Sequence, residues 1–217
     1  MQAGVCAPFC RIHGIGPRET WYFSDETVEI TREWLALRYR LIPYLQRQVR
    51  EAMVSGLPVM RSMVLAFPED QRTWNFELQY MFGDHLLVVP VLQPGGWVTV
   101  CLPEGVWYNY FTGDRIEGGQ VFTVQMELEH IPIFVRQGAV IAEGPAVQHT
   151  GEINKENRIE KIRIFGYPEA DSLHYEPDVS LIHEQASTRL TYKQGVVFEI
   201  YDMDYTTPED GTLVMSL

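Results

Sequence analysis

The residues best suited to chemistry lie close to the start of the chain, in the stretch from Phe9 to His13. In a β-strand alternate side chains point to the same face, so Phe9, Arg11 and His13 would share one face. An aromatic ring, a cation and an imidazole then lie in a row that ends beside Gly14. Ligands of α/β barrels bind at the carboxyl ends of the strands, which makes Arg11 and His13 candidate ligand-binding residues. From these residues alone, a buried Arg11–His13 pair without a ligand remains the alternative.

An aromatic loop with Trp21 and Phe23 follows this stretch. Because the loop comes directly after the predicted strand, Trp21 is a candidate residue at the mouth of the same site. The isolated acids are expected to lie in helix caps and turns, where a short carboxylate accepts backbone N–H groups. They are Asp25, Asp70, Asp84 and Asp114.

The composition limits the classes of ligand. The 217 residues include 29 acidic and 17 basic side chains, which give a formal charge of −12. Nucleic-acid binding depends on clustered Lys and Arg, so this balance argues against a nucleic-acid partner and favours a neutral or small polar ligand. A hydrophobic fraction of 46% is typical of a globular protein, and the length allows one large domain or two small ones.

Metal and disulfide chemistry is not indicated. The three cysteines, Cys6, Cys10 and Cys101, lack metal-ligand spacing and are too few for a disulfide framework. The histidines are scattered without paired spacing. We therefore predict no metal and no cofactor, and the sparse cysteines favour a reducing compartment, which suggests a cytoplasmic location.

No segment predicts membrane insertion. The longest compact apolar run, Leu86 to Leu92, is far shorter than the ~20 residues that cross a bilayer. The first eight residues lack the features of a signal peptide. The first strand has no earlier strand to pair with, so we expect further chain upstream of it.

Helical periodicity dominates the region from Ser24 to Ser55. Ser24 is a suitable N-cap, and Trp34 begins a series of apolar residues spaced three and four apart. Pro43 removes a backbone donor, which predicts a kink or break near Leu41. Gly56 is suited to end the helix.

Short strands punctuated by Gly and Pro follow, a pattern typical of an antiparallel β-sandwich. The predicted strands are residues 59–67, 86–92, 97–102, 107–111, 121–126, 131–136 and 139–142. A polar stretch at 148–157 predicts a linker. Further strands at 158–165, 172–175, 179–183, 188–192, 196–201 and 212–217 predict a second β module.

Six segments together resemble the C-terminal half of glycoside hydrolase family 31, the α-glucosidases and α-xylosidases. They match the family in order and spacing, and they are residues 2–14, 37–44, 56–61, 79–91, 102–108 and 131–138. The resemblance implies a mainly β fold: the terminal strand and helix of a (β/α)8 barrel (1–57), a proximal β-sandwich (58–147), and a linker with part of a distal β module (148–217). The distal match is looser, because the family's acidic turn is replaced by Tyr175-Glu176-Pro177-Asp178-Val179.

The resemblance also implies a role for the opening stretch. The histidine of the family's Phe-x-Arg-x-His motif hydrogen-bonds sugar hydroxyls where the bond is cleaved, and His13 occupies the matching position. Arg11 also matches, and either contacts sugar or braces the barrel. The family uses two aspartates in a retaining mechanism, and neither signature is present in this chain.

The implied function is therefore the C-terminal part of a retaining α-glycosidase acting on α-glucosides or α-xylosides, inactive alone. Its expected partners are the carbohydrate and either the missing barrel portion or a second copy. The alternative is a non-catalytic carbohydrate-binding or scaffold module. In that case the exposed aromatics among Trp97, Trp107, Tyr108 and Tyr110 would stack on sugar rings. Core packing is nevertheless expected for this group, because Trp107 follows a glycine turn in a pattern typical of a sandwich interior.

Overall fold

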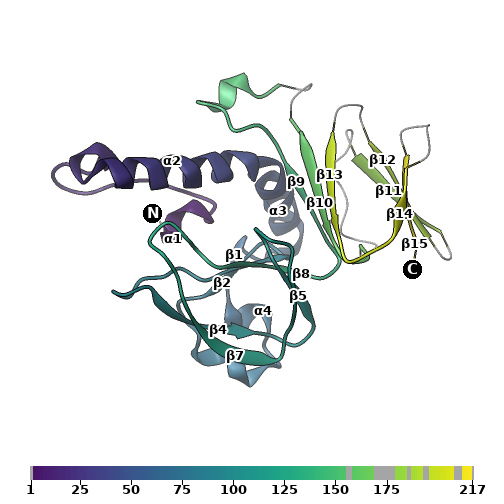
Figure 1. Ribbon diagram of the computed structural model, residues 1–217, viewed down its shortest axis with the longest axis horizontal. Coiled ribbons are helices and arrows are strands. Elements are labelled where there is room, and N and C mark those ends of the chain that lie inside the picture. The colour runs from purple at the N-terminus through teal and green to yellow at the C-terminus, as the bar shows by residue number, and fades with distance from the viewer. Residues whose placement is uncertain are drawn as a thin grey trace.

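The computed structural model describes residues 2–154, 158–168, 179–184, 187–192, 196–207 and 212–216. A helical layer lies over one face of an antiparallel sheet, a two-stranded sheet lies under the other, and two further sheets form a second β unit (Figure 1). This arrangement confirms the mainly β fold class.

Two consecutive helices form most of the helical layer. Helix α2 spans Asp25–Arg40 and begins where the Ser24 hydroxyl accepts a hydrogen bond from the Thr27 amide. Leu41 separates it from α3, Ile42–Ser55, and Pro43 lies in the first turn of α3, where its missing N–H costs nothing. Gly56 ends α3 with a left-handed φ of 76°. The predicted start, break and end of the helical region are all confirmed.

The proximal sandwich has a six-stranded sheet in the order β1-β2-β3-β8-β5-β6, paired antiparallel throughout. Its strands are β1 Met60–Ser62, β2 Tyr80–Phe82, β3 Leu86–Val88, β5 Val106–Asn109, β6 Arg115–Glu117 and β8 Ile133–Arg136. Strands β4, Trp97–Leu102, and β7, Gln120–Gln125, pair as a separate two-stranded sheet. The predicted antiparallel sandwich is confirmed, except that the strand predicted at 139–142 to complete it pairs with residues 161–165 in a separate sheet.

Alternation along the strands divides the core in two, because successive side chains leave a strand on opposite faces. Phe82 and Val88 pack toward the helices with Trp34 and Leu37. Met81, Leu87 and Trp107 pack toward the two-stranded sheet. The six-stranded sheet is therefore buried on both faces, and one face carries the helical layer.

The distal strands form a second sandwich. One sheet has the order β13-β10-β9, from β13 Val197–Tyr201, β10 Lys161–Phe165 and β9 Ala139–Glu143. The other has the order β11-β12-β15-β14, from β11 Val179–Glu184, β12 Ser187–Tyr192, β15 Thr212–Ser216 and β14 Tyr205–Thr206. Val140 and Ile164 from the first sheet share a core with Leu190 and Met215 from the second. Strand β9 also contributes Ala139 and Ile141 to the helix-side core, so one strand joins the two cores.

Two local predictions were wrong. The Phe9–His13 stretch forms no strand; the short helix α1, Gln2–Val5, precedes an irregular segment. A strand needs a neighbour for its backbone groups, and no described strand pairs with this segment. The strand predicted over 59–67 ends at Ser62, and helix α4, Met63–Ala66, turns Met63 into the core. The strand predicted at 172–175 and the turn at 175–179 lie outside the described residues, apart from the backbone of Val179.

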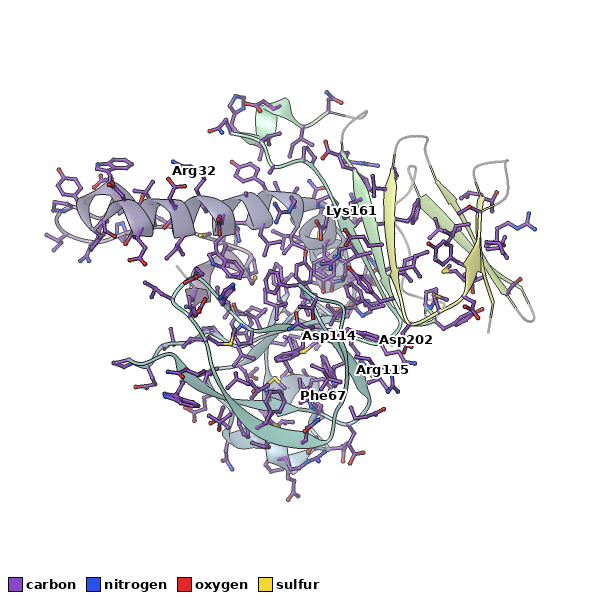
Figure 2. All side chains as sticks on the ribbon, viewed as in Figure 1. Arg32, Phe67, Asp114, Arg115, Lys161 and Asp202 are labelled. Atoms are coloured by element: carbon purple, nitrogen blue, oxygen red, sulfur yellow. The ribbon has the colours of Figure 1, made fainter. Side chains whose placement is uncertain are left out.

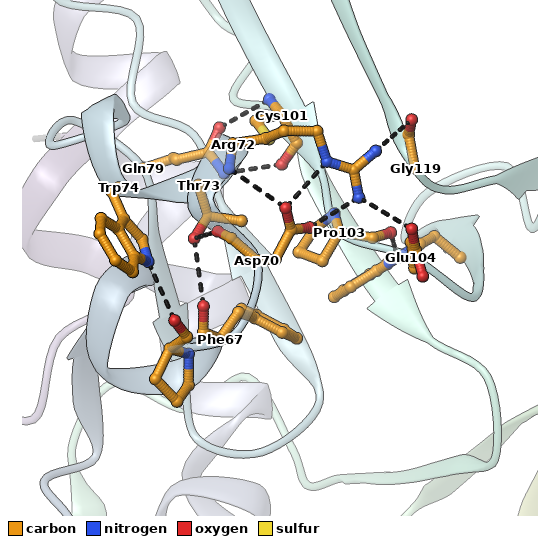
Figure 3. Close-up of polar contacts among 12 residues, drawn as sticks. Phe67, Asp70, Arg72, Thr73, Trp74, Gln79, Cys101, Pro103, Glu104 and Gly119 are labelled. Carbon is orange, nitrogen blue, oxygen red and sulfur yellow. Dashed lines mark hydrogen bonds and ion pairs between the residues drawn. The ribbon is translucent and has the colours of Figure 1, made fainter.

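Side-chain bonds hold the connection between α4 and β2 in place (Figure 3). This connection contains a short 3-10 helix, η2, Gln71–Asn75. The Asp70 side chain caps the start of η2. Arg72 donates two 2.8 Å bonds to the Asp70 carboxylate and one of 2.7 Å to the Gly119 carbonyl. Gln79 pairs through its amide with both backbone groups of Cys101, at 2.8 and 2.9 Å. Thus Asp70 has the capping role expected from the sequence.

Candidate functional site

Arg38 on α2 holds the backbone that leads into the opening stretch. Its guanidinium donates to the carbonyls of Val5 at 2.8 Å, Ala7 at 2.6 Å and Pro8 at 3.1 Å. A planar fork with several donors suits such a set of carbonyls. The Tyr80 hydroxyl donates to the Ala3 carbonyl at 3.3 Å, which ties α1 to the sheet. The chain is thus fixed up to Pro8.

Beyond Pro8 the side chains face solvent. Arg11 and His13 are exposed, so the alternative of a buried Arg11–His13 pair is wrong. Phe9 is 92% exposed and Ile15 is 98% exposed, which is unusual for large apolar side chains in a packed domain. The segment therefore presents its polar and apolar side chains outward, without a described strand beside it.

Trp21 lies in the 3-10 helix η1, Thr20–Tyr22, just before α2. Its ring is 71% exposed and lines an open surface pocket of about 410 Å³ with Arg32 and Tyr39 of α2 and Val147. Arg11 and His13 do not line this pocket. The structure gives Trp21 an accessible ring at a concave surface.

Core packing, expected for four aromatic residues of the sandwich, is confirmed for three of them and wrong for Trp97. Trp107 is 1% exposed and donates its indole N–H to the Pro103 carbonyl at 3.0 Å, which confirms core packing. Tyr108 and Tyr110 are also buried. Trp97 is 55% exposed and is the member of this group left at the surface.

The other isolated acids lie at a helix start and in turns. Asp25 begins α2, Asp114 accepts from the Thr112 hydroxyl in a turn, and Asp84 pairs with Arg61. The Arg61–Asp84 contact is 2.6 Å long, and Arg61 also donates to the Pro58 carbonyl at 2.8 Å. Asp25, Asp84 and Asp114 thus confirm the cap and turn interpretation, and Asp84, in the turn between β2 and β3, also forms an ion pair that only the fold reveals.

A buried polar cluster at the junction of the two sandwiches was not predicted. Glu143 on β9 accepts a 2.5 Å hydrogen bond from the Tyr110 hydroxyl. Arg163 on β10 donates to Glu199 on β13 and to the Tyr201 hydroxyl, each at 2.8 Å. Burial, followed by the charge of Glu143, holds the pKa of Tyr110 well above its usual range. A sequence signal existed: Lys161 and Arg163 alternate with apolar residues within 161–165, and Glu199 is the one charged residue within 197–201.

Ion pairs also link the distal unit to the proximal sheet. Arg115 on β6 contacts Asp202, just after β13, at 3.2 Å, and the two lie together in Figure 2. The Tyr108 hydroxyl donates to the same carboxylate at 3.0 Å. Burial, and then the bonded carboxylate, raises the pKa of Tyr108 to about 12, so this hydroxyl remains a donor near neutrality.

One group of side chains within the described residues has the spacing of metal ligands. Glu127, Glu129 and His130 offer ligand atoms within 4.8 Å of one another, in a largely exposed loop. The Trp34 indole donates to the Glu129 carbonyl at 2.7 Å and fixes this loop against α2. Exposure favours ordinary solvation of these carboxylates over metal binding.

Comparison with known families identifies the N-terminal helical segment and the proximal sandwich. Residues 1–48 match the glycosyl hydrolases family 31 TIM-barrel domain, and residues 56–141 match the glycosyl hydrolase family 31 C-terminal domain. The two matches follow one another in the order expected from the sequence. The chain belongs to glycosyl hydrolase family 31.

Individual members of family 31 agree with this assignment. Alpha-glucosidase 2 of Bacillus thermoamyloliquefaciens is 33% identical over 98% of this chain, and the match covers 27% of that enzyme. An alpha-xylosidase of Saccharolobus solfataricus is 39% identical over 64% of the chain and 20% of the enzyme. The chain therefore spans about a quarter of the length of these relatives.

Solved structures of family 31 members share the fold. A dextranase variant of Flavobacterium johnsoniae, complexed with isomaltotriose, matches all of this chain and 35% of its own with a TM-score of 0.75 and 25% identity. An alpha-xylosidase from a soil metagenome, complexed with xylose, is 34% identical over 64% of this chain and 24% of its own, with a TM-score of 0.56. No helix in the described ranges is both long and apolar enough to span a bilayer.

Proposed function

We propose that this chain is the C-terminal part of a retaining α-glycosidase that hydrolyses α-linked glucosides or xylosides. The observation that carries the proposal is the ordered pair of family matches, a barrel segment at 1–48 followed by the C-terminal domain at 56–141. Relatives named as an α-glucosidase and an α-xylosidase support this substrate class. The corresponding domains are residues 1–57, 58–147 and 148–217.

In this proposal the opening stretch supplies one wall of the sugar site. The exposed imidazole of His13 hydrogen-bonds sugar hydroxyls, and Arg11 contacts the sugar or braces the barrel beside it. Trp21 adds an accessible ring at the mouth of the site. Arg38 supports this role because it fixes the backbone only three residues before Arg11.

The catalytic aspartates come from outside this chain. A retaining glycosidase needs a nucleophile and an acid/base on two carboxyls about 5 Å apart, flanking the scissile bond. The isolated aspartates of the proximal unit instead cap a helix, close a turn or pair with arginine. The chain alone is therefore inactive.

The missing partner is the remainder of the barrel or, failing that, a second copy of the chain. Apolar side chains that would pack against it are exposed at Phe9, Ile12 and Ile15, and on α3 at Met53 and Val54. Exposed apolar surface of this extent favours association in water. The assembled enzyme is proposed to act in the cytoplasm, as the few free cysteines suggest.

An assay of the isolated chain with chromogenic α-glucosides and α-xylosides tests the proposal. We expect no turnover above that of a heat-denatured sample. Fusion to the barrel segment of Alpha-glucosidase 2 should restore hydrolysis, because 27% of that enzyme matches this chain at 33% identity. Hydrolysis by the isolated chain would overturn the proposal, as would a folded but inactive fusion.

A further inference from the structure

Two adjoining pockets share Phe111 and Arg40 as their common wall. One, of about 360 Å³, also includes Trp34, Glu129 and His130. The other, of about 460 Å³, extends to the strands of the distal unit, and its lining includes Tyr110, Glu143, Lys161, Arg163 and Glu199. We call this double pocket the Phe111 groove. Each half lies within the ~300–1,000 Å³ typical of small-molecule sites.

The ring of Phe111 stands between the two halves in a fixed orientation. It packs edge-on against Trp34, with centroids 5.9 Å apart at 89°, and against Tyr110 at 5.2 Å and 85°. Its backbone amide donates to the Asn109 side chain at 2.8 Å. Phe111 is nevertheless 48% exposed. An aromatic surface that is held in place loses little conformational entropy when a ligand covers it.

The floor of the larger half is polar and rigid. Glu143 is 4% exposed and Arg163 is 5% exposed, and Arg163 lies 4.4 Å above the Tyr110 ring. Glu199 accepts from Lys161 at 2.6 Å and from Arg163 at 2.8 Å. Because these bonds fix the polar atoms before any ligand arrives, the groove is preorganised.

The charges of the groove select a neutral ligand. Arg40 and Lys161 face Glu160 and Glu199 in one half, and Glu33 and Glu129 line the other. An anion would meet these carboxylates, and a simple cation would meet the guanidinium and ammonium groups. A ligand with many hydroxyls can hydrogen-bond to both the cationic and the anionic side chains, because each hydroxyl donates and accepts. Sugar rings add apolar faces that can cover Phe111.

We propose that the Phe111 groove binds a neutral oligosaccharide, with one sugar ring stacked on Phe111 and its hydroxyls bonded by Arg40, Lys161 and Glu199. Lys161, labelled in Figure 2, begins β10 and lines the distal side of this groove. The site uses none of Arg11, His13 and Trp21. It goes beyond the proposed hydrolysis and holds whether or not that proposal does.

Titration of ¹⁵N-labelled chain with maltotriose and with isomaltotriose tests the site. We expect amide shifts to concentrate at residues 110–112, 143–144 and 160–163, with Phe111→Ala raising the Kd at least tenfold. Lys161→Met should also raise the Kd, by a smaller factor. Because Lys161 is not a core side chain, this second variant tests the site even if Phe111→Ala does not fold. His149→Ala, at an exposed histidine outside the groove, and Trp97→Ala serve as controls and should leave the Kd unchanged.

Several outcomes would overturn the site. They are an absence of binding at millimolar sugar, binding that Phe111→Ala and Lys161→Met leave intact, and loss of binding in Trp97→Ala or His149→Ala. A polyanionic probe, polygalacturonate, should bind more weakly than maltotriose; tighter binding would indicate an anion site and contradict the proposal. Hydrolysis assays play no part in this test, so failure here is distinguishable from failure of the proposed function.

Discussion

Glu143 and Arg163 lie on paired strands, and the distance from Arg163 Nη1 to Glu143 Oε1 is 3.7 Å with both side chains 6% exposed. Their strands, β9 and β10, run antiparallel, and Arg163 is in register with Ile141. This pair belongs to the cluster that joins the two β units. It places two opposite charges out of water at the point where both cores meet.

Arg163→Met should destabilise the chain by about 3 kcal/mol, because removing one partner leaves Glu143 with less compensation for its burial. Urea unfolding followed by fluorescence measures the loss. Arg32→Met is the matched control: its pair with Glu29 is 64% and 66% exposed, so the loss should be below about 1 kcal/mol. Equal losses in the two variants would contradict the role given to the buried cluster.

Stability should fall as the pH falls below neutrality because of His85. Burial, and then the charge of Arg47, lowers the pKa of His85 to about 4, while Asp84 opposes this shift. Between the usual value of about 6.5 and pH 4, the unfolded chain binds a proton that the folded chain does not. Across this pH window His85 lowers the free energy of unfolding by about 3 kcal/mol.

In His85→Leu the free energy of unfolding should depend less on pH. Urea unfolding at pH 7.0 and at pH 4.5 measures this difference. The substitution is tolerated because His85 Nδ1 has no hydrogen-bond partner among the described residues. His149→Ala, at an exposed histidine, should retain the dependence on pH. A profile for His85→Leu as steep as that of the parent would contradict the assignment.

Gly83→Ala should cost more than Gly56→Ala, although both glycines have positive φ, 69° and 76°. A Cβ on Gly83 would lie 2.5 Å from Gln48 and from the Tyr44 hydroxyl, whereas Gly56 faces open space. The backbone term is about 1 kcal/mol in both, and crowding at Gly83 adds at least as much again. Thermal unfolding of the two variants gives the comparison, and similar losses would show that the Gly83 turn has room to adjust.

Arg38→Met should loosen the opening stretch while leaving the sandwiches folded. Three carbonyls, those of Val5, Ala7 and Pro8, would lose their donor. Hydrogen exchange should accelerate at least tenfold at residues 5–12 and stay unchanged in β3 and β8. Unchanged exchange at residues 5–12 would mean that packing of Val5 and Cys6 suffices to hold the segment.

His13→Ala should reduce kcat/KM of the active fusion by at least 100-fold if the imidazole bonds the sugar at the cleaved position, a loss of about 2.7 kcal/mol. His149→Ala is the matched control at an exposed histidine and should retain full activity. Activity in His13→Ala within threefold of the parent would exclude this role for His13.

The sequence determined the elements whose signals are local. The Ser24 cap, the break before Pro43 and the glycine stop at Gly56 depend on neighbouring residues, so helices α2 and α3 were predicted with their bounds. Strand β4 was predicted at its exact residues because alternation and flanking turns mark it. The family motifs are local patterns too, and they identified the family before any coordinate.

Tertiary structure alone decided what depends on pairing between distant residues. The Phe9–His13 stretch alternates like a strand, but a strand forms only beside a partner, and its exposure followed from that. The hydrogen bond between Tyr110 and Glu143 joins residues 33 positions apart, and the larger pocket at Phe111 brings Arg40 together with Glu199. No local pattern encodes such contacts, because the register between strands brings them together.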